Sequence, residues 1–265
     1  MRTVLITGCS TGIGRATALR LARGGFEVVA TARRPETLEE LAAAGCRTLA
    51  LDVTSAASME AALARIERVD ALVNNAGYSQ SGALETLSMD AVRRQFETNV
   101  FGLLRLTQLV LPGMRDRGAG TIVNVSSMGG KLVFPGGGAY HATKYAVEAL
   151  SDALRMEVKP FGIDVVCVEP GLIRTEFGAT AAGGVEETGP YAAFNAAVAK
   201  STRDVYTGPL SRLGGDADAV AAAIEKALAN PRPRVPVTAS ARLFIGLRRI
   251  LPDRAWDAVV GRSFR

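Results

Sequence analysis

The chain has 265 residues, of which 48% are hydrophobic and 22% are charged. This composition is close to that of ordinary globular proteins, so it excludes wholesale disorder and the fibrous, repetitive and disulfide-stapled miniature classes. The three cysteines (Cys9, Cys46 and Cys167) are an odd number without a Cys-x-x-Cys pair, and there is one histidine. This pattern argues against a disulfide framework and a zinc site, and it indicates a reducing cytosol.

The formal net charge of +5 is unevenly distributed. From Pro231 onward there are eight arginines and two acidic residues, which leaves 23 of the 31 basic and 24 of the 26 acidic residues in the rest of the chain. This argues against a nucleic-acid-binding surface over the whole domain and indicates a local role for the tail. We find no apolar stretch of spanning length and no signal-peptide pattern, so we expect a soluble, cytoplasmic protein.

Short aliphatic runs alternate with amphipathic stretches, which is typical of βαβ units around a parallel sheet. The runs predict about seven strands, at residues 3–7, 27–31, 47–51, 70–74, 120–125, 163–169 and 234–237. Helices are expected to begin near Gly12, Pro35, Ser55, Ser88, Ala139 and Asp216. Right-handed crossovers then predict one α/β domain over residues 1–265, a doubly wound parallel sheet with helices on both faces.

Residues 172–215 interrupt this alternation. They are rich in Gly and Ala and have apolar anchors at Phe177, Tyr191 and Phe194. We interpret them as a cover over a substrate site, with a plain surface excursion as the alternative.

Residues 239–265 predict a basic, amphipathic extension of two short helices separated at Pro252. Packing over the pocket, peripheral membrane contact and contact with another subunit remain open for it. Its apolar stripe is expected to comprise Leu243, Phe244, Leu247, Ile250 and Leu251, followed by Trp256, Val259 and Val260. Its polar side is expected to comprise Arg242, Arg248, Arg249, Arg254 and Arg262.

The sequence TGCSTGIG follows the first predicted strand and places Gly8, Gly12 and Gly14 at a strand-to-helix junction. Glycines there let the backbone approach a pyrophosphate at a helix N-terminus. The spacing is not G-x-G-x-x-G, and no Lys-Ser/Thr pair makes it a P-loop. We predict a dinucleotide site, with a purely structural turn as the alternative.

Arg33 and Arg34 end the second predicted strand, where a site for NAD(H) usually has an acid. Arginine accommodates a 2′-phosphate, so NADP(H) is preferred over NAD(H), with a solvated arginine pair as the alternative. One charge-assisted hydrogen bond of about 1.5–3 kcal/mol corresponds to a preference of about 10- to 100-fold. Asp52, followed by Val53, either accepts from the adenine amino group or caps the next helix.

Tyr140 and Lys144 lie one helical turn apart in a predicted helix, on one face. A neighbouring ammonium lowers the phenol pKa from about 10, so the pair can act as a general acid/base. Ser127 follows the fifth strand, at the edge where open α/β sheets bind ligands, and can polarise a carbonyl. The one-turn spacing of Tyr140 and Lys144 also fits ordinary surface residues on an amphipathic helix. We interpret His141 as a helix residue near the pocket mouth rather than as a catalyst.

The motifs TGCSTGIG, NNAG (residues 74–77), NVSS and YHATK, in this order and spacing, resemble the short-chain dehydrogenase/reductase superfamily over nearly the whole chain. ATARRPETLEEL, LDVT and VEPGLIRTEF are similar to the branch related to 17β-hydroxysteroid and retinol dehydrogenases. The resemblance implies a Rossmann-type fold and a tetrad in which Tyr140 transfers the proton. Lys144 holds the nicotinamide ribose and lowers the pKa of Tyr140, Ser127 binds the substrate oxygen, and Asn99 orders a water in a proton relay.

The resemblance also implies a nicotinamide-cofactor site. Its glycine turn binds phosphate, Ile13 backs the nicotinamide, and the NNAG residues stabilise the sheet beside the cofactor. Ile173 and Thr175 contact the carboxamide. The implied cofactor-binding residues are Gly8, Ser10, Thr11, Gly12, Ile13, Gly14, Arg33, Arg34, Asp52, Val53, Asn74, Ala76, Gly77, Tyr140, Lys144, Pro170, Gly171, Ile173 and Thr175.

These residues together predict an NADP(H)-dependent oxidoreductase that transfers hydride between nicotinamide and a carbonyl or secondary alcohol, working chiefly as a reductase of a bulky hydrophobic ketone or aldehyde. Helices near residues 89–117 and 139–161 commonly form dimer or tetramer interfaces in such enzymes, and no metal is expected. An NADPH-binding redox sensor without turnover and a sugar-nucleotide epimerase are the alternatives. The predicted substrate pocket comprises Tyr78, Met128, Val133, Phe134, Leu172, Phe177, Tyr191 and Phe194.

Overall fold

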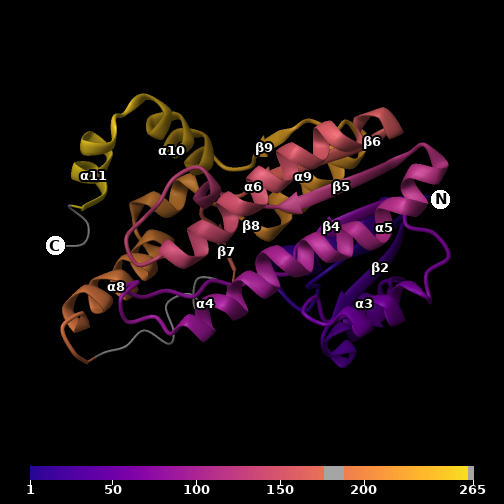
Figure 1. The fold of residues 1–265 in the computed structure, drawn as a ribbon, viewed down its shortest axis with the longest axis horizontal. Coiled ribbons are helices and arrows are strands. Elements are labelled where there is room, and N and C mark those ends of the chain that lie inside the picture. Colours follow the sequence, from indigo (N-terminus) through magenta and orange to yellow (C-terminus); the bar gives the residue numbers. More distant parts are fainter. Residues whose placement is uncertain (176–187, 262–265) are drawn as a thin grey trace.

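The computed structural model describes residues 1–175 and 188–261 (Figure 1). Seven parallel strands form one sheet in the order β3-β2-β1-β4-β5-β6-β9, so the chain winds outward in both directions from β1 and β4. The predicted doubly wound fold is confirmed, and each strand matches its predicted range to within one residue at either end. The strands are β1 Thr3–Ile6, β2 Glu27–Ala32, β3 Arg47–Ala50, β4 Ala71–Asn74, β5 Gly120–Val125, β6 Ile163–Glu169 and β9 Arg234–Pro236.

Helices cover both faces of this sheet (Figure 1). The first face is covered by α1 Gly12–Arg23, η1 Pro35–Leu38, α2 Glu39–Ala43 and α9 Ala217–Ala229. The second is covered by α3 Ala56–Leu63, α5 Leu103–Arg117 and α6 Gly138–Val158. Shorter elements connect or extend them: α4 Met89–Phe96, η2 Glu97–Gly102, η3 Met128–Gly130 and η4 Lys159–Phe161. Within the described residues, none of the helices has the length and apolarity needed to span a bilayer.

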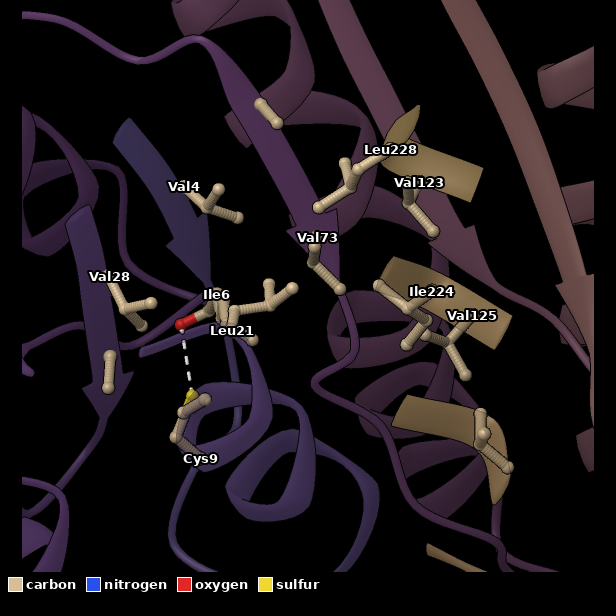
Figure 2. Close-up of a cluster of buried hydrophobic side chains, with 14 of the residues drawn as sticks. Val4, Ile6, Cys9, Leu21, Val28, Val73, Val123, Val125, Ile224 and Leu228 are labelled. Carbon is tan, nitrogen blue, oxygen red and sulfur yellow. Dashed lines mark hydrogen bonds between the residues drawn. The ribbon is translucent and has the colours of Figure 1, made fainter. Parts of the chain in front are cut away.

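Alternate residues of each strand enter two separate cores. In β1, Val4 and Ile6 face α1 and α9, whereas Leu5 faces α5. Figure 2 shows the first core, where Leu21 of α1 and Ile224 of α9 lie with side chains of the central strands. Because both faces are covered, the central strands β1 and β4 are buried along their whole length, whereas the edge strand β3 keeps exposed residues.

Within residues 1–175 and 188–261, four α-helices begin where a side chain caps them. The side-chain oxygens of Ser55, Ser88 and Asp216 accept hydrogen bonds from the backbone N–H three residues later, at 3.2, 3.2 and 2.9 Å. Thr238 does the same at 3.1 Å for α10. Such a cap contributes about 1 kcal/mol, which explains why these helices start at the predicted residues.

The segment at residues 172–215 contains regular structure in its described part. A short strand, β7 Ile173–Arg174, pairs with β8 Gly215–Asp216, so the two ends of the segment are held together. Between them lie α8 Ala192–Thr207 and η5 Pro209–Leu213. Phe177 lies outside the described residues.

The tail forms the two predicted helices, α10 Ala239–Ile250 and α11 Asp253–Gly261, separated at Pro252. Its predicted apolar stripe was wrong in part. The residues that α10 buries are Ala241 and Ile245, which pack with Trp256 and Val260 of α11 against Met128, Leu132 and Leu172. Phe244 and Leu251 contribute to this cluster, whereas Leu243, Leu247, Ile250 and Val259 are exposed. The predicted set of buried residues was wrong in part because α10 carries apolar residues on two sides.

Candidate active site

The glycine turn between β1 and α1 is a tightly packed backbone structure. Gly8 and Gly12 have φ angles of +71° and +57°, in the left-handed region that favours glycine. A Cβ on Gly14 would lie 2.3 Å from the carbonyl oxygen of Gly8. All three glycines are therefore required by this backbone, which supports the predicted role of the turn.

Asn75 holds the turn, and we did not predict this. Its Nδ2 donates to the carbonyl oxygens of Thr7 and Gly8, at 2.9 and 3.0 Å. The backbone N–H groups of Asn75 and Ala76 both donate to Thr7 Oγ1 at 3.0 Å. The signal was available, because Asn75 is the second asparagine of the NNAG motif.

The start of α1 is suited to an anion. Thr11 makes no side-chain cap there, unlike the capping residues of α3, α4, α9 and α10, and the first turn of α1 has no acidic residue. Free N–H groups and the positive end of the helix dipole favour phosphate. A Cβ on Gly12 would contact Thr175 at 3.7 Å and no other residue within 4 Å, so the glycine turn faces the 170–175 stretch. These residues fit the pyrophosphate of a dinucleotide.

The residues predicted to read the adenosine half lie beside this turn. The Cys9 N–H donates to the Thr31 carbonyl at 2.9 Å, which ties the turn to the end of β2. Arg33 and Arg34 follow β2 and are exposed. Asp52 Oδ1 accepts from the N–H of Thr54 at 2.9 Å. Since Ser55 caps α3, the alternative that Asp52 caps this helix was wrong.

Tyr140 and Lys144 lie in the first two turns of α6. Lys144 is 7% exposed, and its Nζ lies 5.8 Å from the centroid of the Tyr140 ring. This Nζ donates to the carbonyl oxygen of Val125, at the end of β5, at 2.8 Å. Burial lowers the pKa of Lys144 to about 8. The Lys144 ammonium is thus held at the carbonyl of Val125, which precedes Ser127 by two residues in the chain.

Ser127 begins the turn η3, where its Oγ accepts from the Gly129 N–H at 3.0 Å. The next N–H, of Met128, donates to the Pro170 carbonyl at 2.8 Å, so this turn contacts the start of the predicted nicotinamide stretch. Because Ser127 Oγ accepts from a backbone group, its hydroxyl proton is available to a ligand.

His141 supports the turn that carries Ser127. Its Nε2 accepts from the Phe134 N–H at 3.2 Å, so its Nδ1 donates to the Gly129 carbonyl at 3.0 Å. The ring is 7% exposed, and burial lowers its pKa, which keeps it neutral. His141 is therefore a positioning residue buried under this turn, instead of a residue at a pocket mouth.

Asn99 lies in η2, a π-helical turn between α4 and α5, and π-helical turns are frequent at functional sites. Its Nδ2 donates to the Tyr78 carbonyl at 2.9 Å and to Thr143 Oγ1 at 3.1 Å. Thr143 Oγ1 donates to the carbonyl oxygen of Tyr140 at 2.7 Å. Asn99 is thereby linked to α6 through the Thr143 hydroxyl group.

Asn74 has a structural position. Its Nδ2 donates to Thr107 Oγ1 and to Asn124 Oδ1, both at 2.9 Å. Asn124 in turn donates to Ser151 Oγ at 2.8 Å. This buried chain joins the two central strands to α5 and α6, as expected for a residue that stabilises the sheet.

The predicted substrate residues lie in separate places. Met128 and Leu172 are buried with the tail, and the Phe134 ring lies 6.2 Å from that of Phe244. Val133 is 45% exposed and lines a groove of about 400 Å³ with Trp256. Tyr78 is half-buried. Tyr191 donates to Glu85 at 2.7 Å, and its ring lies 6.2 Å from that of Phe194.

Glu169, directly before Pro170, is an acid in an unfavourable site. It is 3% exposed, and its Oε1 lies 3.4 Å from Arg234 Nε. Burial, with repulsion from Glu148, raises the pKa of Glu169 to about 7. The folded state therefore loses stability as pH rises from the unfolded pKa of 4.5 through about 7, where the buried carboxyl ionises.

We expect Glu169→Gln to raise the unfolding temperature at pH 8 by several degrees, from about 1–3 kcal/mol of added stability. At pH 5 the two proteins should unfold at nearly the same temperature, because the wild-type carboxyl is then protonated. Thermal melts at both pH values test this. Asp164→Asn, at an exposed position of β6, is the control and should change neither melt. A lower unfolding temperature for Glu169→Gln at pH 8 would contradict the expectation.

Comparison with known proteins identifies the family. Residues 2–186 match the family described as short chain dehydrogenase. The uncharacterized oxidoreductase YbbO of Escherichia coli K12 is 37% identical, with 98% of this chain and 94% of that protein covered. Human retinol dehydrogenase 8 is 44% identical over 66% of this chain and 60% of its own length. The predicted resemblance to retinol dehydrogenases is thus confirmed.

Solved structures agree with the sequence comparison. A short-chain dehydrogenase from Streptomyces avermitilis has a TM-score of 0.82 and 39% identity, with 100% of this chain and 99% of that chain covered. A serine dehydrogenase in complex with NADP+ has a TM-score of 0.78 and 30% identity, with 89% and 94% covered. The glycine turn, the Tyr140–Lys144 pair and these matches together show that the chain belongs to the short-chain dehydrogenase/reductase family of oxidoreductases.

Proposed function

We propose that the protein is an NADP(H)-dependent reductase of a bulky, apolar ketone or aldehyde, with Tyr140 as the proton donor. The observation that carries this proposal is the buried Lys144 ammonium beside the Tyr140 ring, at the end of β5. A cation near a phenol stabilises the phenolate and makes proton transfer possible near neutral pH.

The nicotinamide cofactor supplies the hydride when it is bound. The Tyr140 hydroxyl gives its proton to the carbonyl oxygen, and the Lys144 ammonium stabilises the phenolate that remains. Ser127 donates a hydrogen bond to the same oxygen, since its Oγ already accepts from Gly129. His141 holds the turn that carries Ser127 through the Gly129 carbonyl, and Asn99 holds the Tyr140 backbone through Thr143 Oγ1. Positioning of the reacting groups in this way raises the rate of the chemical step.

NADP(H) is the preferred cofactor in this proposal. The uncapped start of α1 suits the pyrophosphate, the exposed Arg33 and Arg34 suit a 2′-phosphate, and a solved relative binds NADP+. Ile173 and Thr175 are assigned to the carboxamide, and residues 172–215 to a cover over the substrate.

We expect Arg33→Ala to raise the KM for NADPH by about 10- to 100-fold, because it removes a charge-assisted hydrogen bond to the 2′-phosphate. The KM for NADH should stay the same, since NADH lacks this phosphate. Steady-state kinetics with both cofactors measure the two values. Arg34→Ala, measured in the same way, shows whether Arg34 instead of Arg33 contacts the 2′-phosphate. Arg23→Ala is the control, because Arg23 is exposed at the end of α1. An equal change for both cofactors would contradict the assignment.

A homo-oligomer is also proposed. Large apolar side chains are exposed on or beside α4, η2 and α6, where similar enzymes associate. They are Met89, Phe101, Tyr145, Met156 and Phe161. Light scattering of the purified protein tests this, and a monomer at micromolar concentration would contradict it.

The test of the proposed reaction is NADPH consumption over a graded panel of small, aromatic, steroid-like and long-chain carbonyl compounds. We expect turnover on the bulky, apolar members and much slower turnover with NADH. Saturable NADPH binding without turnover on the whole panel would contradict the proposal.

A further inference from the structure

The α10 helix is apolar on two opposite sides, and one of these sides is buried against the rest of the protein. Ala241 and Ile245 are buried in the tail cluster. On the other side Leu243, Leu247 and Ile250, spaced by four and three residues, are 46%, 38% and 81% exposed. Three large aliphatic side chains in one helical row form a continuous outward stripe, which a soluble surface rarely leaves uncovered.

The exposed stripe has arginines along its edge. Arg242 directly precedes Leu243 and Arg249 directly precedes Ile250. Both arginines are exposed, and they lie together on the adjacent arc of the helix. Between them Gly246 adds no side chain, and a Cβ there would have no neighbour within 4 Å.

The Arg242 and Arg249 guanidiniums are exposed, although the charge of Arg249 also acts on the buried Glu169 and partly offsets the rise that burial causes in the pKa of that carboxyl. Arg248, which points inward, pairs with Asp253 at 2.6 Å and lies over the Trp256 ring at 6.0 Å. In contrast, the ion pairs among the described residues include neither Arg242 nor Arg249. From Pro231 onward the chain carries eight arginines and two acids, whereas the rest is nearly neutral.

We propose that the outer face of α10, with Leu243, Leu247 and Ile250 as the apolar stripe and Arg242 and Arg249 as its basic edge, binds the surface of an anionic phospholipid bilayer. Apolar residues enter the boundary between headgroups and acyl chains, and arginines contact lipid phosphates. The helix has 12 residues, or about 18 Å, so it lies in the interface and does not cross it.

Charge favours this partner over a second copy of the chain. A two-fold contact through the stripe brings the cationic edges of both copies into one interface, and α10 has no acidic residue to pair with them. An anionic bilayer instead neutralises them. The helix is also preformed, because Thr238 caps it and Ser240 Oγ accepts from the Leu172 N–H at 3.1 Å. Binding therefore requires no folding of α10.

The test is flotation of the whole purified protein with vesicles of mixed phosphatidylcholine and phosphatidylglycerol, at low and at raised salt. We expect binding to the mixed vesicles at low salt, weaker binding at raised salt, and little binding to phosphatidylcholine alone. Arg242→Gln with Arg249→Gln should weaken binding by about 25-fold, at about fivefold per cation.

Ile250→Glu and Leu247→Glu should each abolish flotation without lowering the unfolding temperature, because both side chains face solvent. Leu84→Glu is the matched control, since Leu84 is 67% exposed in the segment between β4 and α4, and this variant should float like the wild type. No flotation of the wild type at low salt would overturn the proposal. So would flotation that Ile250→Glu leaves unchanged, or a wild-type dimer that Leu247→Glu dissociates. None of these readouts depends on the proposed reductase activity.

Discussion

Replacing Tyr140 by phenylalanine is expected to lower kcat/KM for NADPH-dependent carbonyl reduction by about 10²- to 10⁴-fold. The substitution removes one hydroxyl group, the proton donor of the proposed reaction, and leaves the ring in place. The affinity for NADPH should change little, because the glycine turn, the start of α1 and the Lys144 contact with Val125 are independent of this hydroxyl. Turnover and NADPH binding, measured by fluorescence titration, separate the two effects.

Tyr145→Phe is the matched control for this experiment. Tyr145 lies on the same helix and is 42% exposed, so the same change there should preserve turnover. If Tyr140→Phe retained wild-type kcat/KM on a substrate of the native protein, the role of Tyr140 as proton donor would be refuted. Loss of NADPH binding together with turnover would show that its role is in the cofactor site instead.

The second large effect is expected for Gly14→Ala. The new Cβ would lie 2.3 Å from the Gly8 carbonyl oxygen and 2.5 Å from Asn75 Nδ2, so the turn cannot keep its backbone. Overpacking of this kind costs about 1–3 kcal/mol of stability. A displaced phosphate turn misplaces the nicotinamide as well, and a shift of about 1 Å can lower kcat/KM by about 100-fold.

Thermal melts measure the stability, steady-state kinetics measure kcat/KM, and NADPH titration measures the affinity of the altered phosphate turn. Gly246→Ala is the control, because a Cβ at that helical position has no neighbour within 4 Å and should stabilise α10 by about 0.5–1 kcal/mol. Gly14→Ala with wild-type stability and wild-type NADPH affinity would show that the turn tolerates a side chain, contrary to its packing.

Local patterns predicted the sheet and the helix that carries Tyr140 and Lys144, because the signals for these elements lie within a few residues. Strand alternation, the glycine turn and the one-turn spacing of Tyr140 and Lys144 each come from short-range geometry. The functions of Asn75 and His141 depend on contacts with the distant backbone of Gly8 and the turn at Gly129. Such contacts between distant segments cannot be predicted from the spacing of residues along the chain.

The errors in the tail have a similar cause. A helix with apolar residues on two sides satisfies the amphipathic pattern in two orientations, and the packing partner selects one. Here the side with Ala241 and Ile245 packs against Met128, Leu132 and Leu172. Met128 and Leu172 are themselves predicted substrate residues, and Phe134, a third one, packs against the same cluster. An inventory of apolar side chains was therefore insufficient to define the substrate site.

The burial of all three cysteines has a practical consequence for labelling. Cys9, whose Sγ donates to the Ile6 carbonyl at 3.3 Å (Figure 2), and Cys167 have pKa values that burial raises to about 12. Burial also raises the pKa of Cys46. Thiols in this state react slowly with maleimides and air, so a single cysteine introduced at an exposed site such as Ile250 can carry a fluorophore without removal of the native ones.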